Sequence, residues 1–172
     1  TGLSALALLP SIAWCYATQK PKSEEPAIKD FAGLGISPDR GSHNAIVDMV
    51  EELGVKRLLI RIPCWQVEQL DLYFRFAELF PDHHILINVL QDRQHVKKPR
   101  LWMQATRQII DSLSPLTDEF QLGNAINRSK WGCHNTKDYL TLLDYVVELK
   151  QTYPQIQFAG SSVIDFEPLS TL

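Results

Sequence analysis

Short apolar or β-branched runs alternate with amphipathic stretches of helical period from residue 31 onward, and this alternation constrains the fold more than any other feature. It is the pattern of consecutive βαβ units, which build a parallel sheet. The predicted strands are, in chain order, 32–37, 57–62, 85–90, 120–123 and 156–162. The run 57–62 is almost continuously apolar, which is typical of a parallel strand buried on both faces. The sequence therefore predicts four complete βα units followed by a fifth strand.

Helix signals separate these strands. Gly54 stands where the first predicted helix ends, and the second helix is predicted over 67–80. Pro99 opens the third helix at its first position. Asn135 caps the fourth, whose apolar residues up to Leu149 are too many for one narrow stripe. We therefore expect this fourth helix to be well buried.

Two parallel architectures fit the alternation, a doubly wound sheet and a closed (β/α)₈ barrel. A doubly wound nucleotide-binding sheet normally carries a GxGxxG turn after its first strand. Here Gly33-Leu34-Gly35 lies inside the first strand and lacks the third glycine. A barrel needs roughly 250 residues, and the sequence has 172. The barrel interpretation thus implies further strands, or an oligomer that completes the barrel.

The N-terminal part differs in composition from the rest of the chain. An almost uniformly apolar run covers 3–17, and a polar run covers 19–26. The apolar run is shorter than the roughly 20 residues of a spanning helix, but it suits a signal-peptide core or a truncated membrane anchor. We assign 1–27 to this signal- or anchor-like segment and linker, and 28–172 to the barrel domain. This predicts an extracytoplasmic or membrane-associated protein; if the apolar run instead packs on the domain, the alternative is a cytoplasmic one.

Charge and cysteine content exclude some partners and cofactors. The net charge is −3, and Lys and Arg are scattered without a basic stripe, so we expect no nucleic-acid partner. The three cysteines show neither CxxC nor Cys/His spacing, and we expect no disulfide framework, no metal and no cofactor.

The residues just after the predicted strands would carry any function, because ligands bind at the carboxyl ends of parallel strands in both architectures. Amide, guanidinium, carboxylate and indole groups are frequent there. They are Asp39, Arg40, Arg61, Trp65, Asn88, Gln91, Asp92, Arg93, Asn124, Asn127, Arg128, Trp131, Ser161, Ser162, Asp165 and Glu167. Such a set suits a carbohydrate, whose hydroxyls need directional partners and whose C–H face stacks on aromatic rings.

Two of these segments resemble strands two and four of the clan A glycoside hydrolases. The first is Leu59-Ile60-Arg61-Ile62-Pro63 with Trp65, and the second is Phe120-Gln121-Leu122-Gly123-Asn124-Ala125-Ile126-Asn127. The resemblance covers 31–168, about half of a clan barrel. It implies a glycosidase-type (β/α)₈ barrel in which Arg61 lies beneath the sugar and orients a carboxylate, while Asn124 donates to the sugar 2-hydroxyl.

The sequence departs from the clan at one decisive position. Where the clan carries its acid/base glutamate after the asparagine, this chain has Ala125, and a methyl group can neither protonate a leaving group nor activate water. The clan's nucleophile comes from strand seven, beyond the predicted strands. Three interpretations remain open: a natural pseudoenzyme, an enzyme that recruits another carboxylate (Asp92, Asp165 or Glu167), or an engineered knockout.

The sequence thus predicts a glycoside hydrolase-like protein that binds or hydrolyses a carbohydrate, with a non-catalytic glycan-binding or scaffold module as the alternative. The candidate catalytic residues are Asn124, Asp165 and Glu167. The candidate substrate-binding residues are Arg61, Trp65, Asn88, Asp92, Asn127, Trp131 and Ser162. The apolar N-terminal run adds a membrane as a candidate partner.

Overall fold

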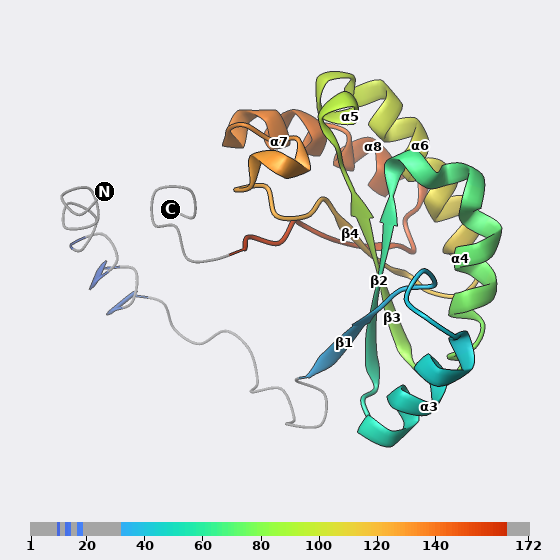
Figure 1. Cartoon of the computed structure of the whole chain (residues 1–172). Coiled ribbons are helices and arrows are strands. Elements are labelled where there is room, and N and C mark those ends of the chain that lie inside the picture. Colours follow the sequence, from blue (N-terminus) through green and yellow to red (C-terminus); the bar gives the residue numbers. More distant parts are fainter. Residues whose placement is uncertain (1–9, 11–12, 15–16, 19–31, 165–172) are drawn as a thin grey trace.

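The protein is an α/β structure built on a five-stranded parallel sheet (Figure 1). The computed structural model describes residue 10, residues 13–14 and 17–18, and residues 32–164. The strands are β1 (Gly33–Ile36), β2 (Arg57–Pro63), β3 (His84–Leu90), β4 (Glu119–Leu122) and β5 (Gln157–Ala159). Their spatial order follows the chain, β1-β2-β3-β4-β5. A doubly wound sheet reverses its strand order at a switch point, and since the described strands show no reversal, that alternative is wrong for this part of the chain.

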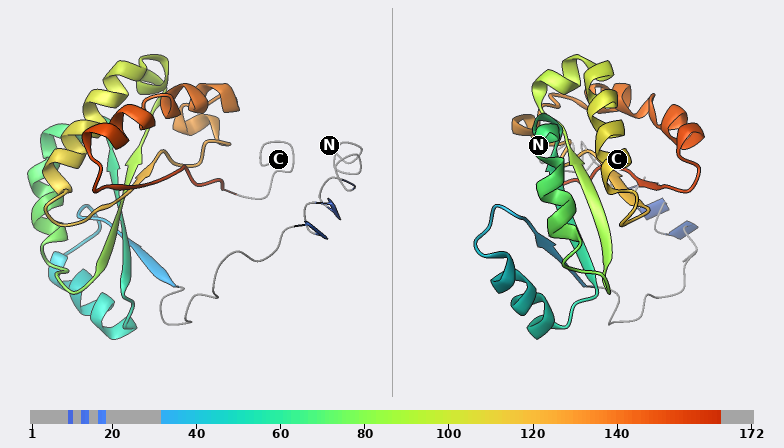
Figure 2. Two further views of the ribbon diagram at one scale, coloured as in Figure 1. Left: turned by 180° about the vertical axis from the view of Figure 1, so that it is seen from behind. Right: turned by 90° about the vertical axis from the view of Figure 1, so that its right-hand side faces the viewer.

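The helical segments lie along one face of the sheet (Figures 1 and 2). They are α3 (His43–Leu53), the 3₁₀ helix η1 (Cys64–Gln69), α4 (Leu70–Ala77), α5 (Arg93–Lys97), α6 (Pro99–Leu113), the 3₁₀ helix η2 (Ser129–Trp131), α7 (Thr136–Leu143) and α8 (Val146–Thr152). This arrangement follows from the topology, because right-handed crossovers between sequential neighbours place every helix on the same side.

Alternate residues of the strands build the core between sheet and helices. Ile60, Ile87 and Phe120 stand in register across β2, β3 and β4, and all three are fully buried. The other face of the sheet is less covered, since Leu59 and Leu86 are only half-buried. The prediction that the run 57–62 is buried on both faces is therefore wrong, because Leu59 is half-buried and Arg61 is exposed in β2.

Several helix signals are confirmed. Gly54 ends α3 in the left-handed region with φ 61°, which glycine adopts without steric cost. Pro99 occupies the first turn of α6. The Asn135 side chain caps α7 by accepting from the backbone N–H of Asp138 at 3.0 Å.

Other helix predictions need correction. The second helix starts earlier than predicted, as η1 directly after Pro63, and a kink at Gln66 separates its first turn from α4. The fourth helix divides into α7 and α8, because the N–H of Tyr145 bonds three residues back to Leu142 and so tightens the turn. Leu140 of α7 is 52% exposed and Val147 of α8 is 64% exposed, so the expectation of a well-buried helix holds only in part.

The N-terminal assignment falls mostly outside the described residues, which include only 10, 13–14 and 17–18 of the segment 1–27. Among the helices that the structure describes, none has the length and apolarity required to cross a bilayer.

Candidate functional site

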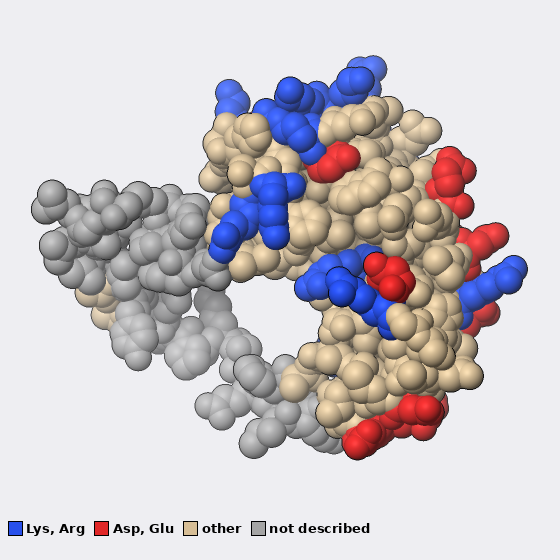
Figure 3. Space-filling model, viewed as in Figure 1, with Lys and Arg blue, Asp and Glu red and all other residues tan. Residues whose placement is uncertain are grey.

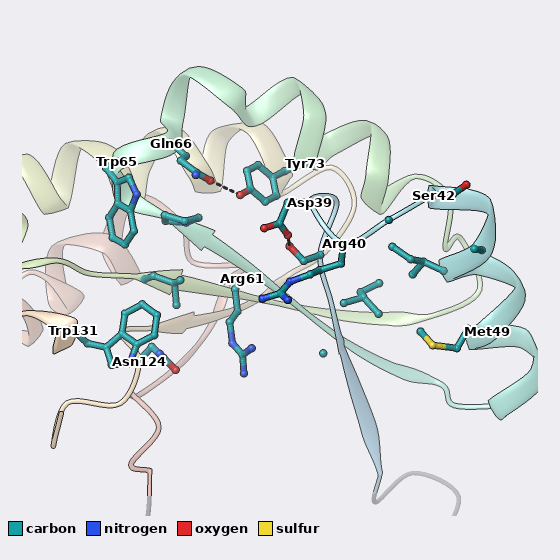
Figure 4. A pocket seen from close by; sticks show the side chains of 18 of the residues that line it. Asp39, Arg40, Ser42, Met49, Arg61, Trp65, Gln66, Tyr73, Asn124 and Trp131 are labelled. Atoms are coloured by element: carbon teal, nitrogen blue, oxygen red, sulfur yellow. Dashed lines mark hydrogen bonds between the residues drawn. The ribbon is translucent and has the colours of Figure 1, made fainter.

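A cavity of about 920 Å³ opens at the carboxyl-terminal ends of the first strands. The loop after β1 contributes Asp39 and Arg40, and β2 contributes Arg61. The segment after β2 adds Trp65, Gln66 and Tyr73, and the loop after β4 adds Asn124, Lys130 and Trp131 (Figure 4). This is the edge of a parallel sheet at which ligands bind in general.

Four of the candidate catalytic and substrate-binding residues line this cavity: Arg61, Trp65, Asn124 and Trp131. In Figure 4 the two indole rings and Asn124 lie toward one end of the cavity, and Arg61 lies near its middle. The structure thus brings together side chains from β2, the segment after β2 and the loop after β4, which are up to 70 positions apart in the sequence (from Arg61 to Trp131).

Arg61 reaches the cavity because of the two-residue period of β2. Its neighbours Ile60 and Ile62 are both fully buried on the helix-covered face, so the side chain of Arg61 must lie on the opposite face. It is exposed, and within the described residues no carboxylate forms an ion pair with it. Its five N–H donors therefore remain for a ligand.

Asn124 is held in place by two neighbouring side chains. Gln91, which is fully buried, donates from Nε2 to the carbonyl of Asn124 and accepts from its N–H at Oε1, both at 2.8 Å. The hydroxyl of Ser162 donates to Asn124 Oδ1 at 3.1 Å. With Oδ1 engaged, the free part of this amide is Nδ2, a donor for which residues 32–164 provide no acceptor.

Ala125 adopts an unusual backbone conformation, with φ 45°. A residue with a Cβ is strained in this left-handed region. Its side chain is fully buried, it is not among the residues that line the cavity, and its N–H donates to Ser162 Oγ at 3.3 Å. The position that resembles the clan's acid/base glutamate therefore faces protein in this chain.

The turn from β4 into its loop is packed from behind by Tyr139 of α7. The Tyr139 hydroxyl donates to the carbonyl of Leu122 and accepts from the N–H of Ser161, both at 2.7 Å. Burial raises the pKa of Tyr139, so the phenol keeps its proton for this contact. Gly123 has φ 92°, and a Cβ there would stand 2.8 Å from the Tyr139 ring, so this turn requires glycine.

The loop after β4 is also tied to the loop after β3. Arg93 donates to the carbonyl of Gly132 at 2.8 Å and forms an ion pair with Asp138 at 2.6 Å. The hydrogen bond from the His134 N–H to Asp138, followed by that from Arg93, lowers the pKa of the Asp138 carboxyl. These contacts fix the loop that carries Lys130 and Trp131.

Other predicted site residues do not line the cavity. Asn88 is buried and donates to Gln121 Oε1 at 2.9 Å and to the carbonyl of Gly123 at 2.8 Å. The Asn127 side chain forms two hydrogen bonds with the backbone of Ile164. Its Nδ2 donates to the carbonyl, and its Oδ1 accepts from the N–H at 3.1 Å. Asn88 and Asn127 are not among the lining residues, nor is Ser162.

Asp92 caps helix α5 and contacts a histidine. Its Oδ1 accepts from the N–H of His95 at 2.8 Å and lies 2.7 Å from His95 Nδ1. Burial by itself raises the pKa of Asp92, but the hydrogen bonds from His95 outweigh it and leave the pKa below its usual value of 3.8. Asp92 does not line the cavity, and Asp165 and Glu167 lie outside the described residues.

Several cavity residues were not among the predicted site residues. Lys130 stands over the Trp131 ring, with Nζ 5.5 Å from its centroid. Tyr73 donates to Gln66 Oε1 at 2.6 Å across the kink that follows β2, and burial, together with the charge of Asp39, raises its pKa. Tyr73 belongs to a helix whose apolar periodicity hides its polar role. Asp39 and Arg40, which the sequence analysis named after the first predicted strand, also line the cavity.

The described residues hold no cluster of His, Cys, Asp and Glu that could bind a metal ion. Cys64 and Cys133 are free and buried, and burial raises the pKa of both thiols, that of Cys133 to about 11. Neither thiol has the lowered pKa of a reactive cysteine.

Comparison with known proteins adds no relative. No family model matches the chain, and neither curated proteins nor solved structures give a significant match.

Proposed function

We propose that this chain is a glycoside hydrolase-like protein that binds a carbohydrate in the cavity at the carboxyl ends of β1 to β4. One observation carries the proposal: two tryptophans, an unpaired arginine and an asparagine with a free amide donor line the same cavity. Indole faces stack on the C–H face of a sugar, and directional donors bind its hydroxyls.

The fold we propose is part of a (β/α)₈ barrel. Supporting it are the sequential strand order, the placement of the helices on one face, and the less covered opposite face, where Arg61, Asn88 and Gln121 stand in register. In a barrel these three side chains would point inward, toward the strands that complete it. Completion by another copy of the chain remains a prediction.

Binding is better supported than hydrolysis. Hydrolysis of a glycosidic bond generally uses two carboxyl groups on either side of the bond. Within residues 32–164 the cavity has one carboxylate, that of Asp39, which accepts a hydrogen bond from the Ser37 hydroxyl. The alternative of an enzyme that recruits Asp165 or Glu167 stays open as a prediction.

Titration calorimetry of the whole chain against a panel of oligosaccharides tests the proposal. Saturable binding is expected, with about tenfold weaker affinity in Trp131→Ala because a stacked ring is lost. Trp14→Ala is the matched control, since Trp14 is 71% exposed and does not line the cavity. A panel that gives no binding, or equal losses in both variants, would contradict the proposal. A reducing-end assay on the same panel separates binding from hydrolysis.

A further inference from the structure

The cavity carries an excess of positive charge. Three cationic side chains, Arg40, Arg61 and Lys130, line it together with a single described carboxylate, that of Asp39. The chain as a whole has the opposite sign, with a net charge of −3. The local charge therefore reflects a particular placement of these side chains and not the average composition.

These cations are not neutralised within the described structure. The ion pairs of residues 32–164 are Arg93 with Asp138, His95 with Asp92, and Arg107 with Glu148. Arg40, Arg61 and Lys130 belong to none of them. Lys130 contacts the Trp131 ring, which leaves its charge intact.

The arginine side chains share one space. In Figure 4 the guanidinium groups of Arg40 and Arg61 both lie in the middle part of the cavity. In Figure 3, Lys and Arg atoms lie at two places where the described surface borders the opening in the centre of the view. Two like charges directed at the same space repel each other, and an anionic ligand group would relieve that repulsion.

A neutral sugar would not compensate the positive charge of this cavity. A guanidinium has a planar fork of N–H donors that matches carboxylate and sulfate oxygens, and such charge-assisted bonds are about twice as strong as neutral ones. The indoles of Trp65 and Trp131 then serve the ring of the same sugar, while the arginines serve its anionic substituent.

We infer that the carbohydrate bound in this cavity is acidic and carries a carboxylate or sulfate group that contacts Arg61 and Arg40. This inference rests on the proposed carbohydrate binding and narrows it to one chemical class.

A glycan array provides the first test. It should present several oligosaccharide backbones, each in a neutral, a uronate and a sulfated form. The expected result is stronger retention of the protein on the acidic members than on their neutral counterparts, and the array shows whether the carboxylate or the sulfate form is preferred. Equal retention on neutral and acidic forms would overturn this inference while supporting carbohydrate binding. If none of the oligosaccharides retains the folded protein, the proposed carbohydrate binding and the preference for an acidic carbohydrate both fail.

Titration with tetragalacturonate and its methyl ester, and with κ-carrageenan tetrasaccharide and its desulfated form, gives the second test. Arg61→Gln should weaken binding of the preferred acidic form about tenfold, as expected for loss of a charged hydrogen bond, and should weaken binding of the neutral form clearly less, because only a neutral hydrogen bond is lost there. Arg40→Gln should act in the same direction. Arg100→Gln is the matched control, because Arg100 is exposed on α6 and does not line the cavity. Equal losses for acidic and neutral forms would overturn the role of charge.

Discussion

The side chain of Gln91 holds the main chain of Asn124 from both sides. Its amide donates to the Asn124 carbonyl and accepts from the Asn124 N–H, each at 2.8 Å, and the side chain is fully buried. This pairing joins the loop after β3 to the end of β4. It satisfies two buried backbone groups at a point where the sheet ladder has ended.

Gln91→Ala should therefore destabilise the protein. Two buried backbone groups would lose their partners, which costs about 1–3 kcal/mol each, and Asn124 would lose its fixed position in the cavity. Urea unfolding measures the loss of stability, and calorimetry with the ligand measures the loss of affinity. Gln91→Glu keeps the acceptor but places a carboxylate at a fully buried site, with one oxygen facing the Asn124 carbonyl, so it should also destabilise the protein. A Gln91→Ala variant as stable as the native protein would contradict this account.

Gly132 is predicted to tolerate no side chain. It has φ 92°, and an added Cβ would stand 2.4 Å from the backbone carbon of Asp92 and 2.6 Å from the N of Arg93. Gly132→Ala should cost about 3 kcal/mol or more, because backbone atoms cannot move aside as a flexible side chain can. Gly41→Ala is the matched control, since Gly41 has φ 82° with open space around it, and it should cost about 1 kcal/mol. Equal losses in urea unfolding would show that the contact with Asp92 is unimportant.

The sequence predicted the sheet better than the site. The apolar runs located all five described strands, and Gly54, Pro99 and Asn135 marked helix ends correctly, because these signals are local. Residues at strand ends were good candidates when their side chains were exposed, as at Arg61 and Trp65. The sequence could not show that Asn88 and Asn127 differ from these residues. The side-chain amides of both form hydrogen bonds with residues 35–37 positions away, Gly123 and Ile164.

The backbone conformation at Ala125 also lay beyond the sequence. Alanine has no preference for φ 45°, and its N–H bonds the hydroxyl of Ser162, a contact over 37 positions that no local pattern indicates. The resemblance to the clan A hydrolases drew attention to this position but gave no indication that its side chain is buried.

Ala125→Glu should destabilise the protein and should not by itself produce hydrolysis. The side chain at this position is fully buried, so a carboxylate there loses its hydration, at a cost of about 3 kcal/mol or more. Ala125→Gly is the control: relief of the left-handed strain and the greater freedom of the unfolded chain nearly cancel, and the change should stay within about 1 kcal/mol. Urea unfolding and a reducing-end assay test both variants. An Ala125→Glu variant of native stability that releases reducing ends would show that this position faces the cavity.

The contact between Asp92 and His95 predicts a loss of stability in acid. The folded-state pKa of Asp92 lies below its usual value of 3.8, so the folded protein binds a proton less readily there than the unfolded chain does. The stabilisation is complete above the unfolded pKa and is lost as the pH falls through the folded one. Asp92→Asn keeps an oxygen to cap α5 but removes the charge. Thermal unfolding of both proteins from about pH 6 to about pH 2 should show a higher midpoint for the native protein at the upper end and a difference that vanishes at the lower end. A difference that stays constant over this range would mean that the charge of Asp92 does not contribute.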